Sequence, residues 1–282
     1  MSQGRYDHEF YLAQRAGSRA SAEVILPIVI NEVGPLRTVI DIGGGVGPWS
    51  RVAMDLGIQH IVLVDGDWIL DQDLEVPVSM TVQRDLEESI SGLGRFDLVI
   101  CLEVAEHLPA NRASSLVADL CLMSDHVLFS AAVPGQGGQN HVNEQWLSYW
   151  QRLFASEGFS LLDPIRTQVW TDPRVDWWYA QNTVLFVKGG PRKVGALVDI
   201  VHPRAISGAI EQARNETEQA QSVAASALAD ITHLRTELVR AVEEANRARE
   251  KVVQAQAENT EIRMSRSWRW TRPLRLLSQK FR

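Results

Sequence analysis

Short apolar runs alternate with longer amphipathic stretches between residues 1 and 190. Such runs are typical of buried strands, and the amphipathic stretches between them are typical of surface helices. Strands are expected at 39–42, at 61–64, in the run that ends before Gln83, and at 96–101, 125–130, 161–162 and 182–187. This alternation predicts an α/β doubly wound domain over residues 1–190.

The hydrophobic period changes farther along the chain. From Ile206 to Ile262, small or apolar residues recur at alternating steps of four and three, and only Thr217 and Asn259 in that series are polar. About eight heptads in one phase predict a coiled coil over residues 205–262, whereas a lone solvated helix has no need to keep that phase. The coiled coil predicts a homo-oligomer, with a dimer as the default.

Two further segments flank the coiled coil. Residues 191–204 follow a Gly-Gly-Pro boundary and are expected to form a linker. Residues 263–282 contain seven Arg or Lys and no Asp or Glu. Arginine interleaved with tryptophan and leucine suits an anionic membrane surface, while a solubilising tail or a peptide that docks on an acidic partner is the alternative.

The bulk composition narrows the possible functions. The 282 residues are 45% hydrophobic and 22% charged, as in soluble globular proteins. Cys101 and Cys121 lie in apolar stretches, and neither a signal peptide nor an apolar run of roughly 18 residues is found, so a cytoplasmic location is expected. The net charge is −7, which leaves −14 on the chain without residues 263–282. The part of the chain before residue 263 is therefore too acidic to predict a nucleic-acid partner.

A glycine-rich turn follows the first expected strand. Asp41, Gly43, Gly45 and Gly47 have the spacing Asp-x-Gly-x-Gly-x-Gly, and a helix is expected directly after them. Glycines let the backbone turn tightly and approach a ligand. Dinucleotide enzymes use a related turn, but the acid that opens this one disfavours a dehydrogenase. Asp65 ends the next strand about 20 residues later, where a carboxylate can bind both hydroxyls of an adenosine ribose.

In these motifs, and in the segments Gln83–Leu86, Phe96–Cys101 and Leu102–Pro109, the chain resembles the class I S-adenosylmethionine-dependent methyltransferases over residues 24–188. The resemblance implies a Rossmann-like sheet of seven strands and S-adenosyl-L-methionine as the cofactor. It implies that the methionine part contacts Asp41, Gly43, Gly45 and Gly47, that the ribose contacts Asp65 and the adenine Asp85, and that Glu103 is a further cofactor contact.

Four side chains near the expected methyl position are candidates for chemistry. Glu103, Glu106 and His107 follow the fourth expected strand, and His141 lies in a glycine-rich loop after the fifth. A sugar hydroxyl is a poor nucleophile, so O-methylation needs a general base or a metal that lowers its pKa. In one interpretation, His107 or His141 is the base and Glu106 assists.

In the second interpretation, Glu103, Glu106, His107 and His141 bind a divalent cation such as Mg²⁺. The spacing Glu-x-x-Glu-His is similar to the metal-binding motif of small-RNA 2'-O-methyltransferases and of ubiquinone-pathway O-methyltransferases. A purely structural interpretation also stands, in which Glu106 caps a helix and His107 is only hydrogen-bonded.

Aromatic and amide side chains are expected to bind the acceptor, because flat rings stack on sugars while amides bond their hydroxyls. The candidates are Trp146, Tyr149, Trp150, Trp170, Trp177, Trp178 and Tyr179, with Asn143, Gln145, Gln181 and Asn182. The segment 265–275 is similar to a tail found on bacterial enzymes that build surface polysaccharides.

These patterns together predict an O-methyltransferase that acts on a saccharide hydroxyl in bacterial cell-surface glycan biosynthesis. The coiled coil and the basic tail would hold it beside glycan-assembly enzymes at the inner membrane face. One alternative is a methyltransferase for a quinone, a phenol or a secondary metabolite. Another is a non-catalytic, methyltransferase-like scaffold on a coiled coil.

Overall fold

A computed structural model of the chain describes residues 8–67, 73–190, 199–271 and 275. Seven strands form one sheet in the order β3-β2-β1-β4-β5-β7-β6. They are β1 (Thr38–Ile42), β2 (His60–Asp65), β3 (Thr81–Gln83), β4 (Leu98–Leu102), β5 (His126–Ser130), β6 (Phe159–Leu162) and β7 (Val184–Lys188). Only β7 runs antiparallel to its neighbours. The doubly wound sheet of seven strands is confirmed, although its last strand starts later than expected because Asn182 still belongs to the preceding helix.

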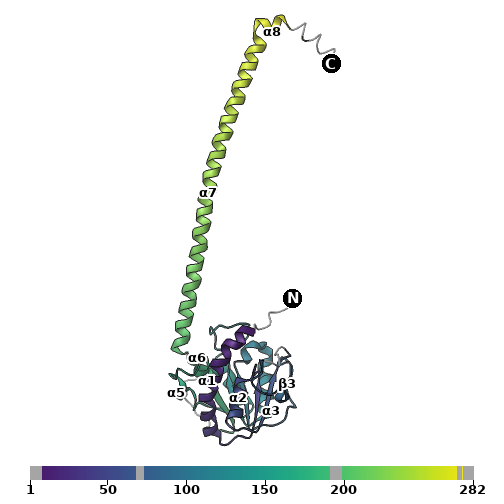
Figure 1. Ribbon diagram of the computed structural model, residues 1–282, viewed down its shortest axis with the longest axis vertical. Coiled ribbons are helices and arrows are strands. Elements are labelled where there is room, and N and C mark those ends of the chain that lie inside the picture. Colours follow the sequence, from purple (N-terminus) through teal and green to yellow (C-terminus); the bar gives the residue numbers. More distant parts are fainter. Residues whose placement is uncertain (1–7, 68–72, 191–198, 272–274, 276–282) are drawn as a thin grey trace. The chain divides into compact units, whose positions relative to one another are not determined.

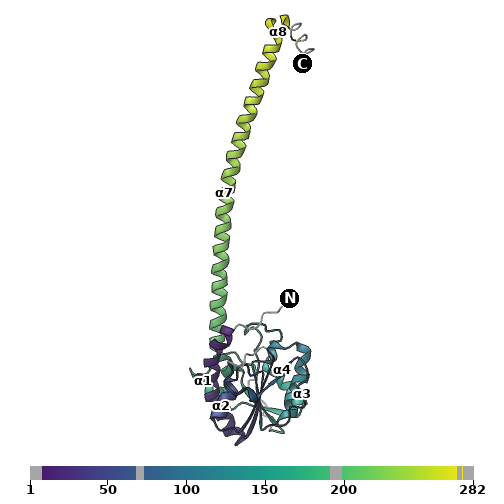
Figure 2. The same ribbon diagram turned by 45° about the vertical axis from the view of Figure 1, so that its right-hand side comes forward.

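Helices cover both faces of the sheet, as Figure 2 shows for α1, α2, α3 and α4. One face carries α1 (His8–Val33), α2 (Pro48–Asp55), α5 (Arg166–Val169) and α6 (Trp177–Asn182), and the other carries α3 (Ala113–Met123) and α4 (Leu147–Ser156). Successive residues of β1 point into different cores: Val39 packs with the α1 layer and Ile40 with the α3 layer. Burial on both faces explains why the strands are continuous apolar runs.

The strands that carry the candidate site are adjacent. In β1, Asp41 pairs with Leu63 of β2 on one side and with Ile100 of β4 on the other. The strand order therefore reverses between β1 and β4, and ligands of such sheets bind outside the carboxyl ends of the strands at this point. All of the predicted cofactor residues except Asp85, which lies just after β3, follow or end one of these three strands.

A buried ion pair fixes the segment that follows β3. Arg112 lies in the turn η4 (Ala110–Arg112), and its guanidinium contacts the Asp119 carboxylate of α3 at 2.6 Å. The same guanidinium donates to the carbonyls of Leu86 and Glu88 at 3.0 and 2.9 Å. Both charged partners are almost fully buried, so the segment beside Asp85 is held by satisfied charges rather than by packing alone.

The C-terminal part is a long helix, α7 (Pro203–Met264), followed by the short α8 (Arg266–Trp270) (Figure 1). The chain divides into two compact units, Met1–Ile210 and Glu211–Arg282. Large apolar side chains of the heptad series, such as Ile231, are exposed along α7. The helix is confirmed, and its assembly into a coiled coil stays a prediction.

The structure describes only part of the expected linker and part of the expected basic tail. Residues 191–198 of the expected linker, and residues 272–274 and 276–282 of the expected tail, lie outside the described residues. Within the described tail, the Arg275 guanidinium lies 3.6 Å from the centre of the Trp268 ring. No helix among the described residues is long and apolar enough to span a membrane. Membrane contact of the tail stays a prediction.

Candidate active site

A cavity of about 930 Å³ lies at the carboxyl ends of the central strands. Of the ten predicted site residues, all but Gly47 line it: Asp41, Gly43, Gly45, Asp65, Asp85, Glu103, Glu106, His107 and His141. Gly47 instead precedes α2, where its backbone is left-handed (φ 89°). The nine lining residues, which the sequence predicted to form one site, thus face one cavity although they span a hundred positions of the chain.

The loop after β1 has no room for side chains. A Cβ atom at Gly43, where φ is +70°, would lie 2.5 Å from the Val104 side chain. One at Gly44 would lie 2.4 Å from Leu63 and 2.5 Å from the Asp41 carboxylate. The bare backbone therefore forms one wall of the cavity, which lets a ligand approach it closely.

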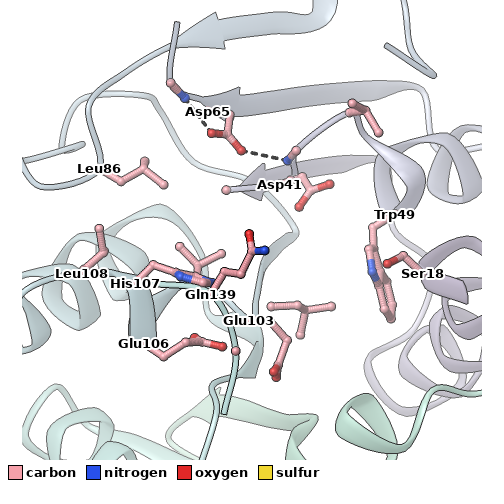
Figure 3. Close-up of a pocket in the computed structure, with 18 of the residues that line it drawn as sticks. Ser18, Asp41, Trp49, Asp65, Leu86, Glu103, Glu106, His107, Leu108 and Gln139 are labelled. Atoms are coloured by element: carbon pink, nitrogen blue, oxygen red, sulfur yellow. Dashed lines mark hydrogen bonds between the residues drawn. The ribbon is translucent and has the colours of Figure 1, made fainter. Parts of the chain in front are cut away.

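Asp65 is fixed at the mouth of this loop. Its two carboxylate oxygens accept hydrogen bonds from the backbone N–H groups of Gly45 and Gly66 at 2.8 and 2.7 Å (Figure 3). A carboxylate has acceptor capacity beyond one bond per oxygen, so both oxygens can still receive neighbouring hydroxyls. Asp85 is held similarly, since its carboxylate accepts the N–H of Glu87 at 2.9 Å. Both acids therefore have fixed positions in the lining of the cavity.

Asp41 lies at the base of the cavity and is 2% exposed. Burial raises the pKa of its carboxyl to about 7, although the hydroxyl of Ser50 donates to it at 2.8 Å, which opposes the shift. The negative charge of Asp65 raises the pKa further. A ligand cation at this position would favour the ionised form.

Glu103 is held by an amide cluster (Gln136, Gln181 and Asn182). Its carboxylate accepts from Gln136 at 3.0 Å and from Asn182 at 3.1 Å, and its backbone has a φ of 54°. Gln181 donates to both other amides and accepts the N–H of His202, which directly precedes α7. Burial raises the pKa of Glu103, while the hydrogen bonds lower it.

Glu106, His107 and His141 meet on the other side of the cavity. Each offers a ligand atom, and the three atoms lie within 4.8 Å of one another. The two imidazole rings are 4.9 Å apart and nearly perpendicular. We call these residues the Glu–His cluster. Glu103 is not part of it, so the structure brings together three of the four predicted metal ligands.

The Glu–His cluster contains an unusual buried acid. Glu106 is fully buried, and neither of its carboxylate oxygens has a hydrogen-bond partner among the described residues. Burial raises its pKa well above the usual range, and the nearby charge of Glu103 adds to the shift. Burial also lowers the pKa of His107 to about 4, with His141 as a second cause, so His107 is neutral at pH 7.

Glu144 orders the loop that carries His141, and sequence reasoning missed it. Its carboxylate accepts the N–H groups of Gly135 and Gly137 and contacts Nδ1 of His141 at 2.9 Å. A carboxylate only accepts, so Nδ1 of His141 carries a proton in this contact. The His-x-x-Glu spacing was the available signal.

The acceptor side differs in part from the expectation. Of the seven predicted aromatics, only Trp177, Trp178 and Tyr179 line the cavity. Trp150 is buried in the core, and Trp146 is 38% exposed elsewhere. None of the four predicted amides lines it, and the amides that do are Gln83, Gln136 and Gln139. Figure 3 shows Gln139 extending into the cavity beside His107.

Comparison with known proteins identifies the family. A sequence profile of the methyltransferase domain family matches residues 7–164, more than half of the chain. The chain belongs to this family and is a class I S-adenosylmethionine-dependent methyltransferase. No curated protein sequence matches it.

Several solved structures share the fold at low identity. Magnesium protoporphyrin IX methyltransferase from Synechocystis PCC 6803 is 18% identical, with a TM-score of 0.45 over 66% of this chain and 90% of that one. Human N-acetylserotonin methyltransferase is 15% identical, with a TM-score of 0.43 over 64% and 55%. An O-methyltransferase family protein from Burkholderia thailandensis is 12% identical, with a TM-score of 0.45 over 64% and 57%. The chain spans little more than half the length of the last two.

Proposed function

We propose that this enzyme methylates a hydroxyl oxygen of a saccharide. One observation carries the proposal: the Glu–His cluster, with its neutral His107, lines the same cavity as the glycine loop and Asp65. His107, which would take a proton from the acceptor, therefore lines the same cavity as the predicted cofactor residues. The role of each site residue stays part of the proposal.

Each group of site residues has a separate role in an in-line displacement of the methyl group. When bound, S-adenosylmethionine supplies an electrophilic methyl group on sulfur. Asp65 and Asp85 hold the adenosine, and Asp41 with the glycine loop holds the methionine part. His107 accepts the hydroxyl proton as the oxygen–carbon bond forms and the sulfur–carbon bond breaks. Alignment of the two reacting atoms provides much of the rate enhancement, and the neutral imidazole provides the base.

A saccharide acceptor is supported by the polar lining next to the Glu–His cluster. Trp177 and Trp178 provide flat apolar surfaces, and Gln136 and Gln139 provide amide donors and acceptors. This combination suits the C–H faces and hydroxyls of a sugar ring. A phenol or quinone would use the rings but has few hydroxyls for the polar side chains of the lining.

The acceptor class is tested with the purified full chain and methyl-labelled S-adenosylmethionine. Methyl glycosides and bacterial surface polysaccharides are compared with catechol and a quinol, and products are identified by mass spectrometry. The proposal expects methyl ethers on the saccharides. Transfer only to catechol or quinol would support the small-molecule alternative. Binding of S-adenosylhomocysteine without transfer to any acceptor would favour the scaffold.

The Glu–His cluster also suits a divalent cation, which we propose as the alternative to a metal-free His107 base, because an imidazole nitrogen that binds a metal has no lone pair left for a proton. Glu106, His107 and His141 would hold it, since the carboxylate oxygens of Glu106 are unpartnered among the described residues and each of the three side chains offers a ligand atom close to the other two. Such a cation lowers the pKa of a bound hydroxyl. Glu103 keeps its amide partners instead.

Removal of metal with EDTA is expected to lower turnover about 100-fold, and added Mg²⁺ or Mn²⁺ should restore it. Calorimetric binding of S-adenosylhomocysteine should not change, because none of the predicted ribose or adenine residues belongs to the Glu–His cluster. Full turnover in EDTA would show that His107 acts without a metal.

Cofactor affinity should depend on pH through Asp41. Its raised pKa of about 7 means that the empty site holds a proton below that pH, whereas a methionine ammonium favours the ionised carboxylate. The Kd of S-adenosylhomocysteine is therefore expected to rise up to about tenfold for each pH unit below 7 and to level off above it. Calorimetry between pH 5.5 and 8 measures this, and Asp41→Asn should flatten the profile. A flat profile for the unaltered chain would contradict the role of Asp41.

A further inference from the structure

Positive and negative side chains of α7 occupy different heptad positions beside the apolar series. The apolar series places Ile210 at an a position and Ile206 at a d position, and the e and g positions flank this series. The e positions hold Arg214, Gln221, Leu228, Arg235, Val242, Arg249, Gln256 and Arg263. The g positions hold Glu216, Val223, Asp230, Glu237, Glu244, Lys251 and Glu258. Every charge at e is positive, and every charge at g except Lys251 is negative.

We propose that α7 pairs with α7 of a second copy of this chain as a parallel, in-register coiled coil of two strands. In that arrangement each g residue faces the e residue of the partner five positions later. The charged pairs are Asp230 with the partner's Arg235, Glu244 with the partner's Arg249, and Glu258 with the partner's Arg263. Val223 meets the partner's Leu228, and no facing pair has charges of the same sign.

The opposite orientation is disfavoured by the same charges. In an antiparallel pair, e positions face e positions and g positions face g positions. Arginines such as Arg235 would then meet arginines, and acids such as Glu244 would meet acids. Like charges at these positions select against a partner orientation, so the charge pattern specifies parallel strands.

The surface that would be covered is exposed and apolar in the single chain. Ile231, Leu234 and Leu238 are 61%, 62% and 64% exposed on successive turns. The a positions include the β-branched residues Ile210, Ile231 and Val252, which favour two strands over three or four. Asn259 also lies at an a position, where a polar residue fixes the register.

One ion pair along α7 lies away from this surface. Arg247 contacts Glu243 at 3.9 Å. These two residues occupy c and f positions, on the outer side of the expected pair. Their charges therefore provide a matched control for the e and g residues.

The test uses the full chain and measures mass in solution by light scattering. Twice the chain mass of 31.5 kDa is expected. Arg235→Glu with Arg249→Glu should weaken dimerisation at least about tenfold, because the facing pairs become repulsive. Arg240→Glu with Arg247→Glu, on the outer side, should leave it within about twofold. Adding Asp230→Arg and Glu244→Arg to the first variant should restore the dimer.

Orientation is tested with Asn259→Cys, since the native Cys101 and Cys121 are buried. Under oxidation it should form a disulfide-linked dimer, because residue 259 meets its own counterpart only when the strands are parallel. A monomer, a trimer, a dimer without the cross-link or a dimer indifferent to the e-position reversals would each overturn the proposal. Binding of S-adenosylhomocysteine should be unchanged throughout, which separates this result from the proposed function.

Discussion

Replacing Glu106 with glutamine is expected to lower kcat for methyl transfer by about 100- to 1,000-fold, within the range of a lost acid–base or metal-binding group. The substitution keeps the shape of the side chain and removes its ability to ionise. The Glu106 carboxylate offers a ligand atom to the Glu–His cluster, and neither of its oxygens has a hydrogen-bond partner among the described residues. Steady-state kinetics measures the loss, and calorimetry should show cofactor binding within about twofold.

Thermal stability separates this functional effect from a structural one. A carboxyl without partners costs free energy when buried, so Glu106→Gln should not lower Tm. Asp119→Asn is the matched control, because Asp119 is also buried but is paired with Arg112 at 2.6 Å. Its loss leaves an uncompensated guanidinium and should cost about 3–5 kcal/mol of unfolding free energy. A Glu106→Gln variant with unchanged kcat would contradict the proposed role.

The cofactor side of the cavity could be predicted from the sequence because its signals are local. The glycine spacing after β1 and the acid that ends β2 lie within 25 residues of one another, and parallel strands bring their carboxyl ends together. Asp41, Gly43, Gly45 and Asp65 could therefore be assigned to one cavity without knowledge of any side-chain contact.

The acceptor side could not be predicted in the same way because its contacts are distant in sequence. Glu103 is bonded by Gln136 and Asn182, which lie 33 and 79 positions away. Whether an amide lines a cavity or supports a carboxylate depends on how its element packs. Asn182 was expected at the acceptor and instead holds Glu103.

Aromatic residues illustrate the same limit. Trp146 and Trp150 are four positions apart, which suggests one helical face. In the structure Trp146 precedes α4 with an extended backbone, and only Trp150 enters the core. A helix boundary, which sequence patterns place poorly, decided the environment of both rings.

Asp65→Asn is expected to weaken binding of S-adenosylhomocysteine about 100-fold. Two hydrogen bonds from ribose hydroxyls to a carboxylate contribute about 1.5 kcal/mol each, and their sum of about 3 kcal/mol corresponds to that factor in Kd. The amide has only one acceptor oxygen, so it also releases one of the two N–H groups, of Gly45 or of Gly66, that now fix the loop. Calorimetric titration measures the change.

A comparison of ligands separates the direct loss from loop disorder. Glu32→Gln, an exposed acid on α1 that does not line the cavity, controls for the loss of one negative charge and should bind normally. If Asp65 binds the ribose hydroxyls, an analogue of S-adenosylhomocysteine that lacks both hydroxyls should bind the unaltered enzyme about 100-fold more weakly than S-adenosylhomocysteine does. The Asp65→Asn variant should bind this analogue no more weakly than it binds S-adenosylhomocysteine. Equal binding of both ligands by the unaltered enzyme would place the ribose elsewhere, because Asp65 would then contribute only through the backbone it holds.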